Sequence, residues 1–370
     1  MALSIASTTK RFHVAVVGVG LVGGELIKQL LAFPQPSPFR LVALASSKTT
    51  LYHPDGLTLA PDAWKTMLAS SGLKPDLPFL VRELAGLVRP GQEAVFVDNT
   101  SSDAVAALYP DLLKLGVHVV TPNKKAFSAE LGLYERILAA SLESGARCLN
   151  EATVGAGLPV VSTLKDLVAT GDKVVKIQGV FSGTMSYIFN EFSTGNAEGP
   201  SFSSVVSVAR EKGYTEPHPA DDLNGADVAR KLTILSRVIP VLRTALPEGY
   251  KSVQTKSLVP VGLEDAATGD DFIARLPQFD AQFDAMRAEA AKAGQVLRYA
   301  GVIDVQSGVI KAGLERYPAT HPFATALGGS DNVIVFHTER YGARPLVVQG
   351  AGAGAAVTAM GVMSDLLKLI

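Results

Sequence analysis

Residues Val14–Leu31 read VAVV-GVGLVGG-ELIKQLL, which is an apolar strand, a glycine turn and an amphipathic helix in succession. The turn has the spacing G-x-G-x-x-G, formed by Gly18, Gly20 and Gly23. Between a strand and a helix, this spacing predicts a dinucleotide site. Its first glycine allows the tight turn, the second admits a pyrophosphate, and the third lets the helix pack closely. The alternative is a turn that serves packing alone, but the strand, the spacing and the helix all favour the dinucleotide site.

The next 120 residues alternate short apolar runs with helical periodicity. Strands are expected at Leu41–Ala45, Ala94–Val97, Val117–Val120 and Arg147–Leu149, and helices at Asp103–Leu115 and Ala129–Ser144. Near-continuous apolar strands indicate a sheet covered on both faces. The alternation therefore predicts an α/β fold with a Rossmann-type, doubly wound parallel sheet in residues 1–150.

The pattern changes after Gly157, where helices and longer connections alternate. Expected here are helices at Pro159–Ala169, Phe202–Lys212 and Asp222–Val238, a hairpin of Leu297–Val305 with Val309–Arg316, and a strand at Asn332–Thr338. Helices with an antiparallel sheet predict an α+β second domain, assigned to residues 151–340. Residues 341–370 form a glycine-rich segment and an apolar helix.

The composition is that of a folded enzyme, with 47% hydrophobic and 19% charged residues and a formal net charge of −1. This charge makes nucleic acid and anionic membranes poor partners. The single cysteine, Cys148, suits a reducing compartment. No apolar stretch resembles a leader or a membrane span, so a cytoplasmic location is expected. The six histidines lack metal-ligand spacing, and His218 alone lies in a candidate site.

The end of the second strand bears on the choice of cofactor. NAD-specific sites usually place Asp or Glu there to bind the ribose hydroxyls. This chain has Ser46-Ser47-Lys48 instead, with no carboxylate before Asp55. A hydroxyl and a cation favour a 2′-phosphate, so NADPH is expected, with NADH accepted. The alternative is that Lys48 is a solvated loop lysine.

Two polar loops follow neighbouring strands at the same sheet edge. Asp98–Ser102 ends one strand and Thr121–Lys125 ends the next. Each could be an ordinary loop, but ligands bind at this edge of open α/β sheets, so together they favour the nicotinamide half of a cofactor site. Further on, Asn150–Pro159 is a polar, glycine-containing hinge. Its accessible carbonyls suit a monovalent cation, or the segment is a plain interdomain turn.

The stretch Lys212–Lys231 concentrates acidic residues before a helix. Asp222 is expected to cap a helix that carries Asp227 and Lys231 on one face, since residues four apart are neighbours. The carboxylates could bind an ammonium group, and a lysine held by a carboxylate could exchange a proton with an alcohol or carbonyl. Most such pairs, however, are surface pairs.

At this point the chain resembles homoserine dehydrogenases, most closely the short monofunctional fungal type. The shared blocks are Gly18–Gly23, Asp98–Ser102, Thr121–Phe127, Glu151–Pro159, Phe181–Thr184, Gly213–Pro217, Asp221–Gly225, Asp227–Lys231, His321–Phe323, Gly329–Asn332 and Gln349–Gly354. They occur in order from the glycine turn to the last helix.

The resemblance implies NAD(P)H-dependent, reversible reduction of L-aspartate 4-semialdehyde to L-homoserine, on the route to threonine, methionine and isoleucine. It makes Lys231 the proton donor, with Asp227 binding and orienting the substrate. Glu216 would hold the substrate's amino group, and Asp222 would support that acidic pocket. The implied cofactor residues are Gly18, Val19, Gly20, Val22, Gly23, Lys48, Thr100, Ser101, Lys124, Gly213 and Gly354. Main-chain carbonyls of Glu151, Val154, Ala156 and Leu158 would hold sodium or potassium.

The resemblance also implies a homodimer formed through the second domain, and a last helix that returns to the nucleotide domain. Feedback inhibition by threonine is not expected, because the sequence ends one helix beyond Gly354. Two rivals stay open on the residues alone. One is a two-domain dehydrogenase of another substrate class, and the other is a cofactor-sensing regulator without turnover.

Overall fold

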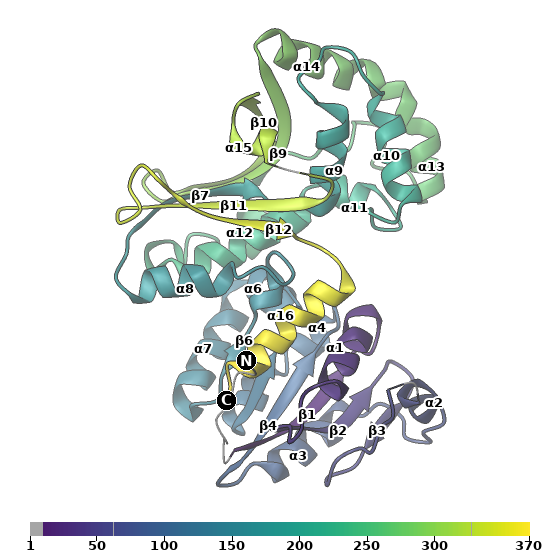
Figure 1. Cartoon of the computed structure of the whole chain (residues 1–370), viewed down its shortest axis with the longest axis vertical. Coiled ribbons are helices and arrows are strands. Elements are labelled where there is room, and N and C mark those ends of the chain that lie inside the picture. The colour runs from purple at the N-terminus through teal and green to yellow at the C-terminus, as the bar shows by residue number, and fades with distance from the viewer. Residues whose placement is uncertain (1–9, 62, 327) are drawn as a thin grey trace. The chain divides into compact units, whose positions relative to one another are not determined.

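A computed structural model describes residues 10–61, 63–326 and 328–370, which form two compact units (Figure 1). The first unit comprises the described residues up to Gly157 together with Gly354–Ile370, and the second comprises Leu158–Ala353. The divisions expected from sequence were at residues 150/151 and 340/341. The second unit extends beyond residue 340 because Leu346–Ala351 forms a strand of its sheet. Within the described ranges, no helix is long and apolar enough to cross a membrane.

The first unit is built on a six-stranded sheet of order β3-β2-β1-β4-β5-β6. Its strands are β1 Arg11–Val17, β2 Phe39–Ala45, β3 Thr50–Tyr52, β4 Gln92–Asp98, β5 Val117–Val120 and β6 Cys148–Leu149. The pairs from β2 to β6 are parallel, which confirms the expected Rossmann-type sheet. The edge strand β3 was not expected. It runs antiparallel to β2, as edge strands of such sheets often do.

The helices of this unit are α1 Leu21–Leu31, α2 Trp64–Ala69, α3 Leu77–Leu87, α4 Asp103–Ala106, α5 Tyr109–Lys114, α6 Lys125–Ser128, α7 Leu131–Ser144, the 3-10 turn η1 Glu151–Thr153 and α16 Ala355–Leu367. The single helix expected at Asp103–Leu115 is interrupted between α4 and α5. Pro110 explains the break, because it has no N–H to donate to the carbonyl of Ala106.

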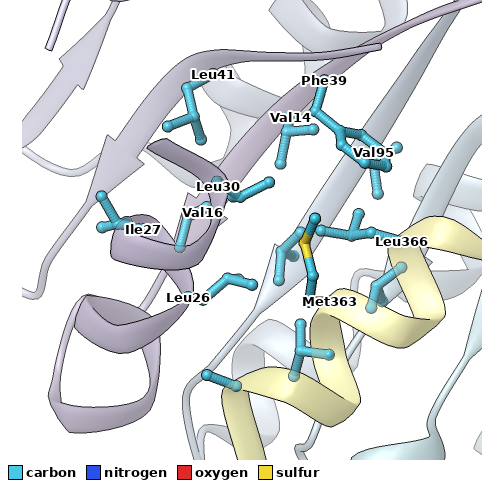
Figure 2. Packing of buried hydrophobic residues seen from close by; sticks show 14 of the residues in the cluster. Val14, Val16, Leu26, Ile27, Leu30, Phe39, Leu41, Val95, Met363 and Leu366 are labelled. Carbon is cyan, nitrogen blue, oxygen red and sulfur yellow. The ribbon is translucent and has the colours of Figure 1, made fainter. Parts of the chain in front are cut away.

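The core of the first unit joins the start and the end of the chain. Leu26 and Leu30 of α1 and Met363 and Leu366 of α16 belong to one buried hydrophobic cluster with residues of β1, β2 and β4 (Figure 2). The strands contribute fully buried side chains such as Val16. The last helix therefore packs beside the helix that follows the glycine turn. In α2, Trp64 and Leu68 are buried, whereas Met67 is 39% exposed.

The second unit contains a sheet of order β12-β11-β7-β9-β10-β8. Its strands are β7 Val174–Val180, β8 Gln254–Thr255, β9 Gln295–Asp304, β10 Val309–Pro318, β11 Asp331–Thr338 and β12 Leu346–Ala351. All neighbours are antiparallel except β8 and β10, and the expected hairpin is β9–β10.

The helices of the second unit are α8 Val161–Ala169, α9 Gly183–Phe192, α10 Phe202–Glu211, α11 Ala220–Leu223, α12 Ala226–Val238, α13 Gly269–Arg275, α14 Asp280–Lys292 and α15 Pro322–Thr325. Short 3-10 turns lie at Pro240–Leu242, Gly249–Ser252 and Leu276–Phe279. Most of α12 is buried, without a break from Lys231 to Arg237, and the helix contacts β9 and β10. This packing fixes the helix that carries Asp227 and Lys231.

Candidate active site

The three glycines of the turn have different surroundings. Gly18 has a φ of +85°, and a Cβ there would lie 2.8 Å from the Asn99 main chain. A Cβ at Gly23 would lie 2.0 Å from the Gly18 carbonyl oxygen. A Cβ at Gly20 would meet no atom within 4 Å. The protein's own packing therefore requires Gly18 and Gly23, whereas the open space beside Gly20 fits a ligand.

The start of α1 suits an anion. Gly20 is its N-cap, no side chain caps the helix, and no acidic residue lies in its first turn. The positive end of the helix dipole is therefore not compensated by a side chain of the helix. Val19 and Val22 are half-buried beside it. This arrangement is that of a pyrophosphate site.

A buried carboxylate joins the two loops at the carboxyl edge of the first sheet. Asp98 is fully buried. Its carboxylate accepts hydrogen bonds from the main-chain N–H of Thr100 at 2.7 Å, the Tyr109 hydroxyl at 2.5 Å and the Asn123 side-chain amide at 3.0 Å. The Thr121 hydroxyl donates to the Asp98 carbonyl oxygen at 2.8 Å. The network fixes the loop after β4 against the loop after β5. Burial and the Asp98 charge raise the pKa of Tyr109, which keeps this hydroxyl a donor.

The other expected cofactor residues of this unit lie on the same loops. Thr100 contacts the glycine turn, since its Cγ2 would lie 2.8 Å from a Cβ at Gly18. Lys124 immediately precedes α6 and is half-buried. Ser101 is exposed, as is Lys48, whose main-chain N–H donates to the Ser46 hydroxyl at 3.1 Å. The structure thus brings the glycine turn and Thr100 together, and it leaves Lys48 on a solvated turn.

In the second unit, a glycine and not an aspartate begins the helix that carries Lys231. The N-cap of α12 is Gly225, with a φ of +76°. A Cβ there would lie 1.9 Å from the Tyr299 hydroxyl oxygen, so only glycine fits. The expectation that Asp222 caps this helix is wrong. Asp222 lies in the preceding short helix α11, and its Oδ2 accepts from the Glu216 amide at 2.8 Å.

Lys231 is buried and held by two acceptors. Its Nζ lies 2.7 Å from Asp227 Oδ2 and donates to the Phe181 carbonyl oxygen, also at 2.7 Å. The Lys231 side chain is 8% exposed and that of Asp227 is 42% exposed. A solvated surface pair is therefore excluded. A buried ammonium beside a half-exposed carboxylate is a group that can exchange a proton with a bound oxygen.

The acidic loop before α12 is held to α9 by a side-chain hydrogen bond. The Thr184 hydroxyl donates to the Tyr214 carbonyl at 2.6 Å. Burial, with a smaller repulsion from Glu216 and Asp227, raises the pKa of Asp222 to about 6. The loop therefore presents carboxylates whose mutual repulsion a cationic ligand would relieve.

His218 contributes to the shape of this loop. Its Nε2 lies 3.0 Å from the Ala266 carbonyl oxygen, and its Nδ1 accepts from the Ala220 amide at 3.3 Å. These bonds make it a structural residue. Gly213, another expected cofactor residue, turns the chain after α10 with a φ of +70°. Gly354, with a φ of +118°, precedes α16.

Comparison with known proteins agrees with the chemistry of both units. A family model described as "Homoserine dehydrogenase, NAD binding domain" matches residues 18–151, and one described as "Homoserine dehydrogenase" matches residues 159–367. The chain belongs to the homoserine dehydrogenase family. It is thus an NAD(P)-dependent oxidoreductase that acts on a CH–OH group.

The relatives match almost end to end. The homoserine dehydrogenase of Schizosaccharomyces pombe is 46% identical, over 99% of this chain and 97% of the relative. That of Emericella nidulans is also 46% identical, over 97% and 98%. A crystal structure of a Candida auris protein of unknown function is 42% identical, with a TM-score of 0.89 over 97% of this chain and 98% of that one. The enzyme is therefore of the short, monofunctional fungal type.

The hinge that precedes the second unit has an unusual backbone. Gly155 and Ala156 both have positive φ values, of +77° and +56°. Such a conformation is uncommon for alanine, and residues held in it cluster at functional sites. The Glu151 carboxylate contacts Lys368 Nζ at 3.1 Å, and its amide donates to Asp365 at 2.7 Å. The main chain and the side chain of Glu151 therefore anchor the turn to α16 and to the residue after it, and the carbonyl oxygens of the turn are the donors suited to a hard cation.

Sequence reasoning missed the supports of the site. Tyr109 and the Phe181 carbonyl bind Asp98 and Lys231, respectively, and neither was expected to do so. Phe181 does lie in a block shared with the family, but a main-chain acceptor leaves no side-chain pattern. In the described ranges, no group of three or more His, Cys, Asp or Glu side chains could hold a metal ion.

Proposed function

We propose that the enzyme reversibly reduces L-aspartate 4-semialdehyde to L-homoserine, on the route to threonine, methionine and isoleucine. The observation that carries this proposal is the buried Lys231, held between Asp227 and the Phe181 carbonyl in a chain of this family. The reduced nicotinamide, when bound, supplies the hydride to the aldehyde carbon. Lys231 gives a proton to the aldehyde oxygen in reduction and takes it back in oxidation.

The carboxylates have separate roles in this proposal. Asp227 keeps the Lys231 ammonium oriented and lies at the solvent side, where it can also bind the substrate. Glu216 receives the substrate's amino group, and Asp222 supports it by holding the Glu216 amide at 2.8 Å. Substrates without an ammonium group, such as sugars and simple hydroxy acids, leave this acidic loop uncompensated.

For the cofactor we propose NADPH, with NADH accepted. Support comes from Ser46 and Lys48 at the end of β2, where no acidic residue would repel a 2′-phosphate. The glycine turn, Thr100, Ser101 and Lys124 would contact the cofactor from the first unit, and Gly213 and Gly354 would complete the set. The open space beside Gly20 and the uncompensated start of α1 fit its pyrophosphate.

The test is homoserine oxidation followed at 340 nm, with NADP and NAD side by side. Homoserine-dependent reduction of the cofactor is expected with both. At low cofactor concentration, the rate with NADP should exceed the rate with NAD. Sugars and 2-hydroxy acids are the comparison substrates, and turnover of those alone would identify another dehydrogenase. Binding of NADPH without any turnover would identify the regulator instead.

Asp222 gives the substrate affinity a pH dependence. Because its pKa is raised to about 6, its carboxyl is neutral below that pH and no longer attracts the substrate's ammonium group. The KM for L-aspartate 4-semialdehyde should therefore rise about tenfold per pH unit below pH 6. Ionisation of Asp222 has the opposite effect on stability: it favours substrate binding but destabilises the folded protein. The unfolded pKa lies near 4, so the native state binds more protons between pH 4 and 6, and the free energy of unfolding from this group falls as pH rises.

The measurement is KM against pH from 5 to 8, with the KM for NADPH as an internal reference. D222N should raise the KM at neutral pH and remove the break near pH 6. A wild-type KM that stays constant from pH 5 to pH 7 would contradict this role of Asp222.

We propose that a monovalent cation, Na⁺ or K⁺, is held by the main-chain carbonyls of Glu151, Val154, Ala156 and Leu158. The consecutive positive φ values at residues 155 and 156 support this assignment. Bound there, the ion would be structural. Dialysis into a tetramethylammonium buffer should lower the melting temperature by several degrees, and NaCl or KCl should restore it. An unchanged melting temperature without both ions would defeat the proposal.

We also propose a homodimer formed through the second unit, and a cytoplasmic location. The support is the family resemblance and, for the location, the single cysteine of the sequence. Sedimentation equilibrium should give twice the chain mass of 38.8 kDa.

A further inference from the structure

One buried amide shares the main-chain acceptor of Lys231. Asn332 is fully buried, and its Nδ2 donates to the Phe181 carbonyl oxygen at 3.0 Å. Lys231 Nζ donates to the same oxygen at 2.7 Å. A carbonyl oxygen has two lone pairs, so these two donors can occupy it together. The geometry of the carbonyl, and with it the place of the ammonium, therefore depends on both.

Sheet register brings Asn332 to this place. Strand β11 pairs antiparallel with β7, and Val333 lies opposite Val180, the last residue of β7. Continuing this register by one residue sets Asn332 opposite Phe181. Phe181 follows the strand and precedes α9, so its carbonyl lies between two regular elements. The Asn332 side-chain amide thus adds a hydrogen bond between β11 and the β7 segment just beyond the last paired residue of β7.

One glycine lies close to the Asn332 side chain, and another lies close to the Phe181 ring. A Cβ at Gly352 would lie 2.0 Å from the Asn332 Nδ2. A Cβ at Gly301 would lie 2.9 Å from the Phe181 ring. Neither position can accommodate a Cβ atom. Because both residues are glycine, Asn332 and Phe181 can pack against the main chain. The sequence blocks Phe181–Thr184, Gly329–Asn332 and Gln349–Gly354 meet at this amide.

The amide is not there for stability alone. Asn332 Oδ1 is buried and has no hydrogen-bond partner in the part of the chain that the structure describes. A buried, unsatisfied acceptor destabilises the folded state, so an apolar side chain of similar size would suit this place better. What an apolar residue cannot supply is the hydrogen bond to the Phe181 carbonyl.

We propose that Asn332 is a positioning residue for Lys231, acting through the Phe181 carbonyl. By occupying one lone pair with a neutral donor, Asn332 directs the other toward the Lys231 ammonium without adding charge. This inference rests on the proposed role of Lys231 in proton transfer. It assigns no contact with substrate or cofactor to Asn332.

The test uses two replacements of similar size, N332L and N332D, in the full-length enzyme. N332L removes the donor, so kcat for homoserine oxidation should fall about 10- to 100-fold while the KM for NADP stays unchanged. N332D places a carboxylate near Lys231 in addition to Asp227 and raises the pKa of the lysine. Since oxidation needs neutral Lys231, its pH profile should move up by about one unit.

The matched control is N190L. Among the described residues, Asn190 Oδ1 is also buried without a hydrogen-bond partner, and the Asn190 Nδ2 donates to the Gly329 carbonyl at 3.1 Å, not to that of Phe181. Its replacement should leave kcat within about twofold and the pH profile in place. A merely structural role for Asn332 would lower the melting temperature of N332L without moving the pH profile of N332D, and that result would overturn the proposal.

A Lys231→Ala background separates the two levels of inference. If K231A is inactive while N332L and N332D keep normal turnover and normal profiles, the Asn332 proposal fails and the role of Lys231 survives. If K231A retains turnover, the proposed function of Lys231 fails first. If N332L lowers the residual rate of K231A as much as it lowers that of wild type, Asn332 does not act through Lys231.

Discussion

K231M should lower kcat for homoserine oxidation by about three orders of magnitude, while NADPH still binds with nearly its normal dissociation constant. A positioned acid or base contributes roughly 10²- to 10⁴-fold. Methionine has a similar length but no proton to give. The binding constant should hold because Lys231 lies in the second unit, whereas the glycine turn and Thr100 lie in the first. Stopped-flow rates and NADPH fluorescence titration measure the two quantities.

The structure supplies a control for the loss of a lysine charge. Lys173 and Glu339 form an ion pair at 3.4 Å in the same unit, with side chains 75% and 59% exposed. Such solvated pairs contribute little to stability, so K173M should keep kcat within about twofold. K231A serves as a second variant if methionine perturbs folding, which the melting temperature reports. Turnover of a folded K231M within tenfold of wild type would end the assignment of Lys231 as the proton donor.

The sequence predicted those parts of the enzyme that depend on local pattern. The glycine turn and the alternation of strands and helices depend on spacings of a few residues, and the parallel sheet follows from them. The pairing of Asp227 with Lys231 depends on one helical turn and was also predictable. The resemblance added the roles, since spacing alone left a surface pair open.

The remainder depends on contacts between distant segments or on single backbone angles. Pro110 divides a segment whose apolar periodicity predicts one helix. Gly225, at a φ of +76° against the Tyr299 hydroxyl, takes the N-cap role that residue type gave to Asp222. The Phe181 carbonyl belongs to no side-chain pattern, and it meets Asn332 only because β7 ends beside the start of β11. Such contacts appear only when the register of the sheet is known.

Gly20, Gly23 and Gly24, at the N-cap and in the first turns of α1, should respond to alanine in three different ways. G20A should fold normally and yet weaken NADPH binding by about 10- to 100-fold. Its φ is −70°, and its methyl group would enter a space that is empty of protein atoms but is expected to hold the pyrophosphate. Overpacking of about 1–3 kcal/mol accounts for this range.

G23A should instead destabilise the first unit, because its Cβ would lie 2.0 Å from the rigid main-chain oxygen of Gly18. A cost of about 3 kcal/mol or more would lower the melting temperature by roughly 6 °C or more. G24A is the matched control in the same helix. Its Cβ would lie 3.6 Å from the Trp64 ring, an ordinary contact, so it should be neutral or stabilising by up to about 1 kcal/mol. Calorimetry and NADPH titration of all three variants separate the ligand from the fold. If G20A bound NADPH as tightly as G24A does, the pyrophosphate could not lie against this turn.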